Sequence, residues 1–173
     1  MTFSVAVQTC LTKFLMLTGR ASRPEYWWFY LFALIVTAIA SIVDGLIFGF
    51  PNEGEVGQNP ITMVASFIVF WPLLAAGWRR MHDTGRPGWL VLLPLLVFIA
   101  GFAFFLITIG IFGEFGHVAN ETSEEMVQTD RVISVFMIFL IIAAMLAAGI
   151  VKLVMLIKPG ETGPNEYGPP PPR

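Results

Sequence analysis

The chain has 173 residues, of which 56% are hydrophobic and only 13% are charged, and its mean hydropathy is +0.75. Because ordinary globular proteins carry about 25% charged residues, this composition excludes a typical water-soluble domain and indicates a membrane protein. The net charge of −2 identifies no class of partner, since the charges are unevenly distributed along the chain.

Apolar residues recur at helical spacing in the first eighteen residues, with polar residues between them. The apolar positions are Phe3, Val7, Cys10, Leu11, Phe14 and Leu15. We expect a short amphipathic helix over residues 1–18, which either lies on the inner membrane surface or packs beneath the helical bundle. Cys10 is the single cysteine, so an internal disulfide and a cysteine-based metal cluster are excluded.

Four apolar stretches are long enough to cross about 30 Å of hydrocarbon at about 1.5 Å per residue. They cover approximately residues 26–47, 61–78, 89–112 and 132–157. Ser22 and Glu25 have the spacing of a capping box and Pro24 suits a first helical turn, so the first of these helices should begin there. The predicted fold is an all-α membrane protein whose four transmembrane helices occupy residues 19–158.

The connecting segments differ sharply in charge. Nine of the ten basic residues lie before the first span, between the second and third, or at the end of the fourth: Lys13, Arg20, Arg23, Arg79, Arg80, Arg86, Lys152, Lys158 and Arg173. By the positive-inside rule, both termini and the connector between the second and third spans are predicted to be cytoplasmic. The two acidic connectors, including residues 114–131, should face outward. Residues 159–173 are rich in proline and glycine and are predicted to be a solvated cytoplasmic tail that can pack back on the inner face.

The connector WRRMHDTGRPGW, residues 78–89, concentrates charge between two apolar stretches. Gly85 suits the left-handed cap at a helix C-terminus and Pro87 suits the next first turn, which predicts a tight hairpin of two helices. Arg79 and Asp83 are four residues apart on the preceding helix, so they are expected to face each other and pair.

Three interpretations of this connector remain open. The arginines can simply set the topology, with His82, Asp83 and Gly85 supporting the hairpin. Together with two arginines before the first span, they can also form a site for anionic lipid headgroups, because arginine suits phosphate. That candidate site comprises Arg20, Arg23, Arg79, Arg80 and Arg86. Catalysis by His82 and Asp83 is the third interpretation, although no nucleophile or second base is evident.

Two ionisable residues lie inside apolar stretches. Asp44 is about one turn from the outer end of the first span, so we expect it at the level of the outer headgroups, although an intramembrane carboxylate is by default a functional candidate. Lys152 can extend its amine to the cytoplasmic surface. Neither a metal site nor a cofactor site is predicted, and His82 and His117 fall on opposite sides of the membrane.

Three motifs together resemble one protein family: GRASRPEYWWF at 19–29, RRMHDTGRPGW at 79–89 and KPGETGPNEYG at 158–168. The chain resembles the YhaH-like proteins, small bacterial inner-membrane proteins grouped as domain of unknown function 805. The departures are small, with Met81 where the family usually has leucine and Pro87 where it often has serine. The resemblance implies a multi-span protein of the bacterial inner membrane, and it implies no reaction.

The sequence therefore predicts a non-enzymatic membrane module whose cytoplasmic arginine face binds anionic lipid headgroups or a membrane-protein partner. A homo-oligomer is compatible with this expectation, and no nucleic-acid partner is expected. One alternative is a small transporter or channel, suggested by Asp44 and by helix kinks at Pro72 and Pro94. Against it, the spans show no internal repeat and almost no polar lining. The other alternative is a lipid-modifying enzyme that uses His82 and Asp83.

Overall fold

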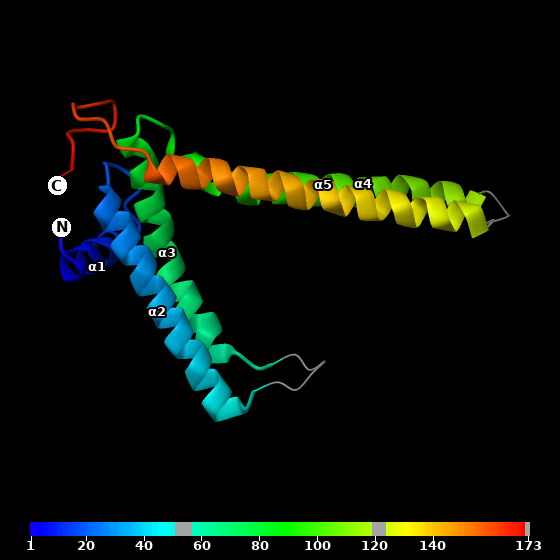
Figure 1. Ribbon diagram of the computed structural model, residues 1–173, viewed down its shortest axis with the longest axis horizontal. Coiled ribbons are helices and arrows are strands. Elements are labelled where there is room, and N and C mark those ends of the chain that lie inside the picture. Colours follow the sequence, from blue (N-terminus) through cyan, green and yellow to red (C-terminus); the bar gives the residue numbers. More distant parts are fainter. Residues whose placement is uncertain (51–56, 119–123, 172–173) are drawn as a thin grey trace. The chain divides into compact units, whose positions relative to one another are not determined.

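The computed structural model describes the backbone of residues 1–50, 57–118 and 124–171, and the side chains of these residues except 109–131. Within these ranges the chain is helical and contains no strand, only an isolated bridge between Asn165 and Gly168 (Figure 1). It forms two compact units, one of residues 1–91 with 155–173 and one of residues 92–154. Four helices are long and apolar enough to cross a membrane, which confirms the predicted fold class.

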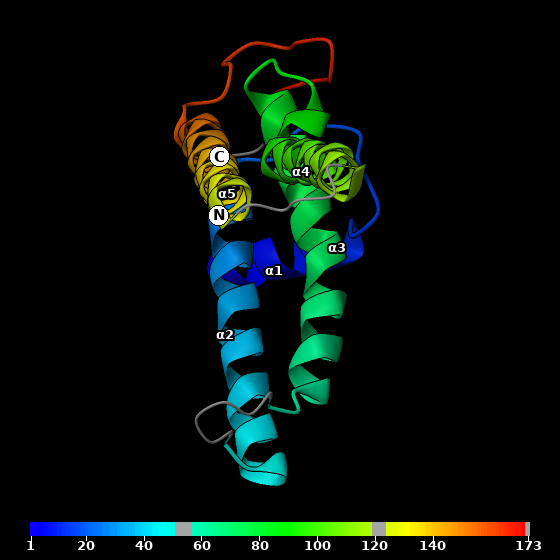
Figure 2. The same ribbon diagram turned by 90° about the vertical axis from the view of Figure 1, so that its right-hand side faces the viewer.

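The N-terminal helix α1, Phe3–Thr12, packs against the first two long helices (Figure 2). Ala6 and Cys10 on its inner face are fully buried, whereas Phe3 and Leu11 are exposed. The helix ends at Thr12, well before the predicted limit at residue 18. It therefore packs against the bundle and also presents apolar side chains outward, so the two predicted placements are not mutually exclusive.

Helix α2, Arg23–Phe48, begins where the capping pattern predicts. Ser22 has extended backbone angles, and its hydroxyl accepts a hydrogen bond from the Glu25 N–H at 3.3 Å. Pro24 occupies the first turn, where a missing N–H costs nothing. Only half of a capping box is formed, because the Glu25 carboxylate pairs with Arg79 on another helix and does not return to the Ser22 N–H.

Helix α3, Pro60–Asp83, runs antiparallel to α2, and the two form the most extensive helix pair of the first unit (Figure 2). Small residues are buried on both helices, including Ala33 of α2 and Gly77 of α3, and Gly77 lies next to Tyr26 of α2. A side chain at Gly77 would collide with Val91, which lies just after the turn that ends α3, so glycine lets this following segment fold back closely onto α3.

Asp44 is fully buried by its neighbours and lies about one turn before the end of α2 at Phe48. Its level relative to the outer headgroups stays a prediction. Its carboxylate accepts hydrogen bonds from the backbone N–H groups of Ile61 and Thr62 at 3.0 and 2.7 Å, and from the Thr62 hydroxyl at 2.7 Å. Asn59, the residue before α3, makes no capping bond with its own side chain. Asp44 therefore caps the N-terminus of α3 from the neighbouring helix, where a negative charge also suits the helix dipole.

A complete Schellman motif ends α3. The Gly85 N–H donates to the His82 carbonyl at 3.1 Å, and the Arg86 N–H donates to the Met81 carbonyl at 3.1 Å. Gly85 has φ +68°, the left-handed conformation that the sequence predicts at this position. The short 3₁₀ helix η1, Gly88–Leu92, follows, so α3 and η1 form a tight hairpin.

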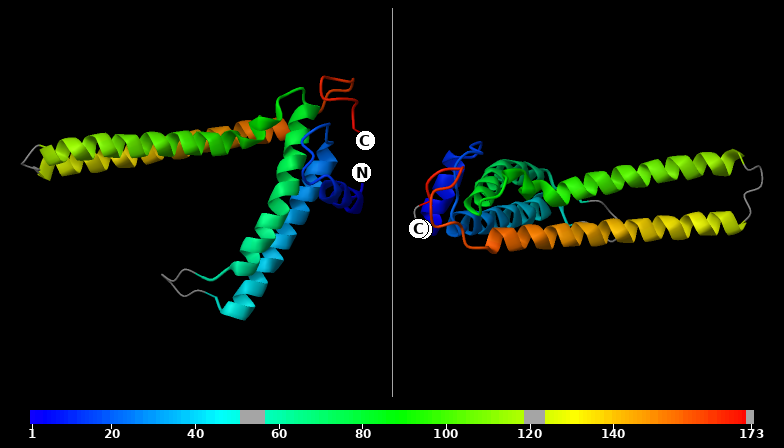
Figure 3. Two further views of the ribbon diagram at one scale, coloured as in Figure 1. Left: turned by 180° about the vertical axis from the view of Figure 1, so that it is seen from behind. Right: turned by 90° about the horizontal axis from the view of Figure 1, so that it is seen from above.

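The second unit contains most of helices α4, Leu93–Val118, and α5, Glu124–Ile157, which run antiparallel (Figure 3). They touch where Gly101 lies against Ile141. Most of their described surface is exposed, as expected for helices surrounded by lipid. Both helices extend into the predicted connector 114–131, of which residues 119–123 and the side chains lie outside the described residues.

The sequence also predicts helix kinks at Pro72 and Pro94 and a Lys152 amine that reaches the cytoplasmic surface. Pro94 is the second residue of α4 and lies where the 3₁₀ helix Gly88–Leu92 passes into α4, so the chain changes helix type next to it. Pro72 does lie inside α3. Lys152 is half-buried and forms no ion pair within the described part of the chain.

The burial of Cys10 predicts slow thiol chemistry. Burial, with a smaller effect of the nearby Glu25 charge, raises the pKa of the Cys10 thiol to about 12. At pH 8 only about one thiol in ten thousand is then ionised, and the thiolate is the reactive form. We expect maleimide to label the folded protein in detergent very slowly and the unfolded protein rapidly, as measured by intact mass. Since Cys10 is the single cysteine, equal labelling rates would contradict the packing of α1 against α2.

Candidate functional site

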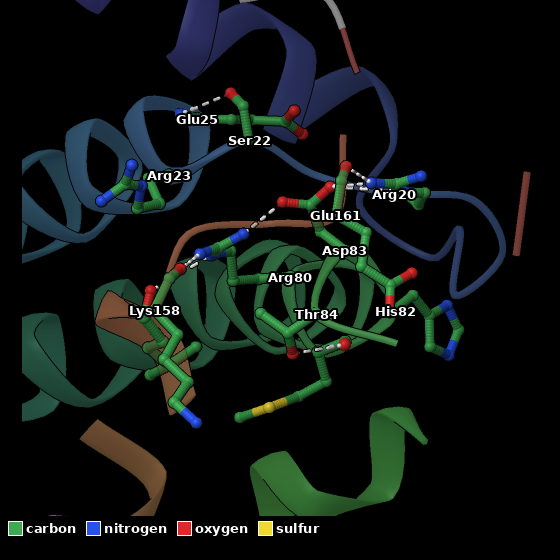
Figure 4. Close-up of polar contacts among 12 residues, drawn as sticks. Arg20, Ser22, Arg23, Glu25, Arg80, His82, Asp83, Thr84, Lys158 and Glu161 are labelled. Carbon is green, nitrogen blue, oxygen red and sulfur yellow. Dashed lines mark hydrogen bonds and ion pairs between the residues drawn. The ribbon is translucent and has the colours of Figure 1, made fainter. Parts of the chain in front are cut away.

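The most polar part of the first unit surrounds the carboxylate of Asp83, at the C-terminus of α3 (Figure 4). Arg20, in the linker before α2, donates from Nε to one carboxylate oxygen at 3.0 Å and places Nη2 2.9 Å from the same oxygen. Arg80, one turn before Asp83, bonds to the other oxygen. All three side chains are buried, with exposed fractions of 0 to 6%. We call Arg20, Arg80 and Asp83 the polar cluster.

The chain after α5 supplies the remaining acceptors for Arg20. Its Nη1 donates to the carbonyl of Gly163 at 2.7 Å, and Nη2 donates to the carbonyl of Glu161 at 2.5 Å. The Glu161 N–H in turn donates to the carbonyl of Asp83 at 2.9 Å. A side chain at Gly160 would collide with the Asp83 carboxylate, so glycine is required for this approach. The predicted solvated tail is therefore bound to the cluster from residue 158 to residue 168.

The C-terminus of α5 is capped by arginines from elsewhere in the chain. Its last turn contains no basic residue of its own. Arg80 donates to the carbonyl of Leu156 at 3.1 Å and also to that of Lys158, and Arg23 donates to the carbonyl of Ile157 at 3.4 Å. These bonds satisfy carbonyls that a helix end leaves free, and the positive charges suit the negative end of the helix dipole.

His82 and the C-terminal segment form a second layer beside the cluster. The ring of His82 stacks on Tyr167 with centroids 3.9 Å apart and planes 5° apart. Its Nδ1 lies 3.1 Å from the carbonyl of Gly19, so this nitrogen carries the proton. The Asn165 amide donates to the His82 carbonyl at 3.0 Å and to the Glu161 carboxylate at 2.7 Å. These contacts fix residues 161–168 against α3.

Arg79 forms a separate buried pair, and its predicted pairing with Asp83 is wrong. Its Nη2 lies 3.2 Å from Oε1 of Glu25, the fourth residue of the α2 cap region, and both side chains are at most 6% exposed. Neither of these two atoms has a hydrogen bond among the described residues, so the pair is an electrostatic contact without aligned geometry. The Arg79 guanidinium pairs with Glu25 of α2, and Asp83 pairs with Arg80, three residues earlier on α3.

A cavity of about 710 Å³ lies beside the polar cluster. It is bounded by the start of α2, the end of α3 and the C-terminal segment. Its lining residues are Ser22, Arg23, Pro24, Trp27, Asp83, Ile157, Pro159, Gly160, Glu161, Thr162, Pro170 and Pro171. Arg23 is exposed, and Figure 4 shows its side chain apart from the polar cluster.

The five arginines predicted as anion contacts thus have different environments. Arg20 and Arg80 are used within the polar cluster, and Arg79 is buried against Glu25. Arg23 lines the cavity, whereas Arg86 is half-exposed and does not line it. The five therefore do not form one exposed face.

Several residues of the site were not predicted as site residues from the sequence. Glu25 was predicted only as part of a helix cap, and Gly160, Glu161, Asn165 and Tyr167 were given no individual role. The signal that points to most of them is the third motif, KPGETGPNEYG, whose polar residues and glycines contact the second motif. From the sequence, the third motif supports the family resemblance and the prediction of a tail that can pack back on the inner face, but it assigns no contact to any of its residues. Its contacts with residues far away in the chain could not be read from local spacing.

The side chains of His82 and Asp83 are both engaged in hydrogen bonds within the protein, and these bonds do not couple the two residues as an acid–base pair. Asp83 accepts from two arginines, and the Nδ1 proton of His82 is directed to a backbone carbonyl rather than to Asp83. Among the described residues, no group of three or more His, Cys, Asp or Glu side chains is placed to hold a metal ion. The polar cluster neutralises the buried Asp83 carboxylate and holds the segment after α5 against the end of α3.

Removal of the Asp83 charge should release the C-terminal segment. In Asp83→Asn, Arg20 and Arg80 lose the only carboxylate that they contact among the described residues, while both remain buried, and breaking a buried pair in this way costs about 3–5 kcal/mol. We expect much faster hydrogen–deuterium exchange in residues 158–168 and a lower melting temperature. Glu166→Gln, an exposed charge removal in the same segment, is the matched control. Unchanged exchange in Asp83→Asn would show that the cluster does not hold the segment.

Comparison with known proteins supplies the family. The family model described as "Protein of unknown function (DUF805)" matches residues 14–120, which include the first two motifs but not the third. Inner membrane protein YhaH of Escherichia coli K12 is 37% identical over 89 residues, covering 51% of this chain and 71% of that protein. Inner membrane protein YhaI of the same organism is 38% identical over 90 residues, covering 51% of this chain and 70% of that protein.

No solved structure matches the chain, and neither relative's name states a reaction. With four helices able to span a bilayer, the chain is a multi-pass inner-membrane protein that belongs to the DUF805 family.

Proposed function

We propose that this protein is a non-enzymatic membrane module that binds the phosphate of a lipid headgroup in the cavity beside the polar cluster. The observation that carries the proposal is the position of Arg23, an exposed arginine in the lining of that cavity. The planar guanidinium matches phosphate oxygens in a two-pronged geometry that lysine cannot reproduce. Arg23 has one long hydrogen bond, 3.4 Å to the carbonyl of Ile157, and forms no ion pair among the described residues.

The location of the cavity supports a lipid ligand. Arg23 is the first residue of α2, one of the helices able to span the membrane, so the cavity adjoins the end of a spanning segment. Trp27 follows four residues later on the same side of α2 and lines the same cavity. Tryptophan is favoured at the headgroup level because its ring is apolar and its N–H is polar. A lipid headgroup could therefore enter the cavity while its acyl chains remain in the bilayer.

This proposal narrows the five-arginine face expected from the sequence to one arginine. Arg20, Arg79 and Arg80 are buried in internal pairs and would have to lose them before they could bind a lipid. Such a loss would leave a buried carboxylate uncompensated, which is costly. Arg23 forms no ion pair among the described residues, so it can bind a phosphate without breaking one.

Lipid retention should depend on Arg23. In Arg23→Gln we expect about a tenfold loss of bound phospholipid, since a hydrogen bond to a charged group contributes about 1.5–3 kcal/mol. The measurement is native mass spectrometry of the detergent-purified protein with phosphatidylglycerol and phosphatidylethanolamine added. Arg86→Gln removes a nearby arginine that does not line the cavity and is the control. Equal lipid retention by wild type and Arg23→Gln would reject the proposal and direct the search to protein partners.

We also propose that the cavity and both termini face the cytoplasm. The proposal rests on the basic residues near this side of the membrane and on the acidic connectors at the other. A fluorescent protein fused after Arg173 should therefore fluoresce, and an alkaline phosphatase fused there should be inactive. The reverse pair of results would place the cavity on the outer face.

A further inference from the structure

The segment between α1 and α2 contains four consecutive large apolar side chains that are exposed. These side chains, which are 41 to 63% exposed, are Phe14, Leu15, Met16 and Leu17. They follow the end of α1, and a turn hydrogen bond joins the Met16 N–H to the Lys13 carbonyl at 3.1 Å. A contiguous exposed apolar group of this kind marks a surface that another apolar material covers. We call residues 14–17 the apolar loop.

Both ends of the apolar loop are fixed to helices that are able to span the membrane. Before the loop, Cys10 of α1 is fully buried, and its Sγ lies 3.8 Å from the carbonyl of Glu25 in the first turn of α2. After the loop, the Ala21 N–H donates to the Arg79 carbonyl of α3 at 3.1 Å. The loop is therefore held at the end of the first unit where α2 begins and α3 ends.

The packing of α1 places this region at the boundary of the bilayer. Helix α1 lies across α2 and α3 rather than along them (Figure 2). The Phe3 ring contacts the rings of Trp28 and Phe32 of α2, with centroids 5.9 and 6.4 Å apart. Phe32 is nine residues, about 13 Å, from the start of α2 at Arg23. Because an interfacial helix buries its apolar side about 5–10 Å into the boundary between headgroups and acyl chains, α1 lies beside α2 at an interfacial depth.

This region is separate from the cavity. Phe32 contacts α1, whereas Arg23 lines the cavity and donates to the last carbonyl of α5. Nine residues make about two and a half helical turns, so these two side chains point to opposite sides of α2. Helix α1, from which the apolar loop continues, therefore lies on the face of α2 opposite the cavity and the end of α5.

We propose that the apolar loop inserts its four side chains among the acyl chains of the membrane leaflet at which α2 begins. The partner is the lipid of the membrane that the helices span, and the contact is with its acyl chains rather than with its phosphate. The inference therefore does not rest on phosphate binding in the cavity, and it assigns the protein a second lipid contact.

The insertion is shallow. The backbone N–H and C=O groups of a turn need polar partners that hydrocarbon does not offer, so the side chains enter the acyl region while the backbone stays at the hydrated interface. Lys13, the exposed residue before the loop, can keep its amine among the headgroups while its methylene chain lies along the apolar side chains.

The test is spin labelling of the full chain in vesicles of phosphatidylethanolamine and phosphatidylglycerol. Four variants each add one cysteine: Phe14→Cys, Leu15→Cys, Met16→Cys and Leu17→Cys. Because the native Cys10 is fully buried, wild type treated in the same way measures the background labelling. Electron paramagnetic resonance gives the collision rates of each label with oxygen, which concentrates among acyl chains, and with a water-soluble nickel chelate. Glu166→Cys, at an exposed position in the polar C-terminal segment, is the matched control.

All four loop labels should show a ratio of oxygen to nickel collisions severalfold higher than that of the Glu166→Cys label. A ratio as low as that of the control would place the loop in water and overturn the proposal. Low collision rates with both reagents would show that protein, from this chain or from a second copy, covers the loop, which also overturns it. Opposite results at neighbouring positions would contradict the loop, because they would show a helix with only one side toward lipid.

Folding of the variants is checked by their melting temperatures. Each substituted side chain is exposed, so we expect values close to that of wild type. A variant that melts well below wild type is left out, and the remaining loop positions then decide between lipid, water and protein as the surroundings of the apolar loop.

Discussion

The buried carboxylate of Asp83 is the constraint on which the polar end of this protein depends. A buried charge is costly unless it is paired and hydrogen-bonded. Asp83 meets this requirement through Arg20 and Arg80, but two arginines and one aspartate leave one excess positive charge. That excess is met by backbone carbonyls at the end of α5 and in the segment that follows it. The cluster therefore cannot form unless three distant parts of the chain are assembled together.

The proposed lipid binding depends on a charged side chain that the polar cluster does not use. The cluster and the Glu25 pair use three of the five arginines that the sequence predicts as anion contacts, and a buried pair that loses one partner leaves a costly uncompensated charge. Arg23 remains beside a cavity at the end of a spanning helix. The polar cluster thus uses its own charges internally and also positions the cavity lined by Arg23, where we propose that a lipid phosphate binds.

Much of the fold could be predicted from the sequence, because it depends on local patterns. The four spans follow from apolar runs, the start of α2 from Ser22 and Pro24, and the end of α3 from Gly85. The site could be predicted only in part, because most of its contacts join residues far apart in the chain, from 54 positions between Glu25 and Arg79 to 148 between Arg20 and Gly168. The i,i+4 rule paired Arg79 with Asp83, but a tertiary partner, Glu25, was closer. The cap formed by Asp44 was missed for the same reason, since its partners lie on another helix.

The most direct test of this account is a double-mutant cycle between Arg20 and Asp83. The free energy of unfolding would be measured by SDS titration for wild type, Arg20→Gln, Asp83→Asn and the double variant. If the buried pair organises the polar end, the two substitutions should be strongly non-additive, with a coupling energy of about 1–3 kcal/mol. Additivity within about 0.5 kcal/mol would contradict the account, because it would show that Arg20 and Asp83 act independently.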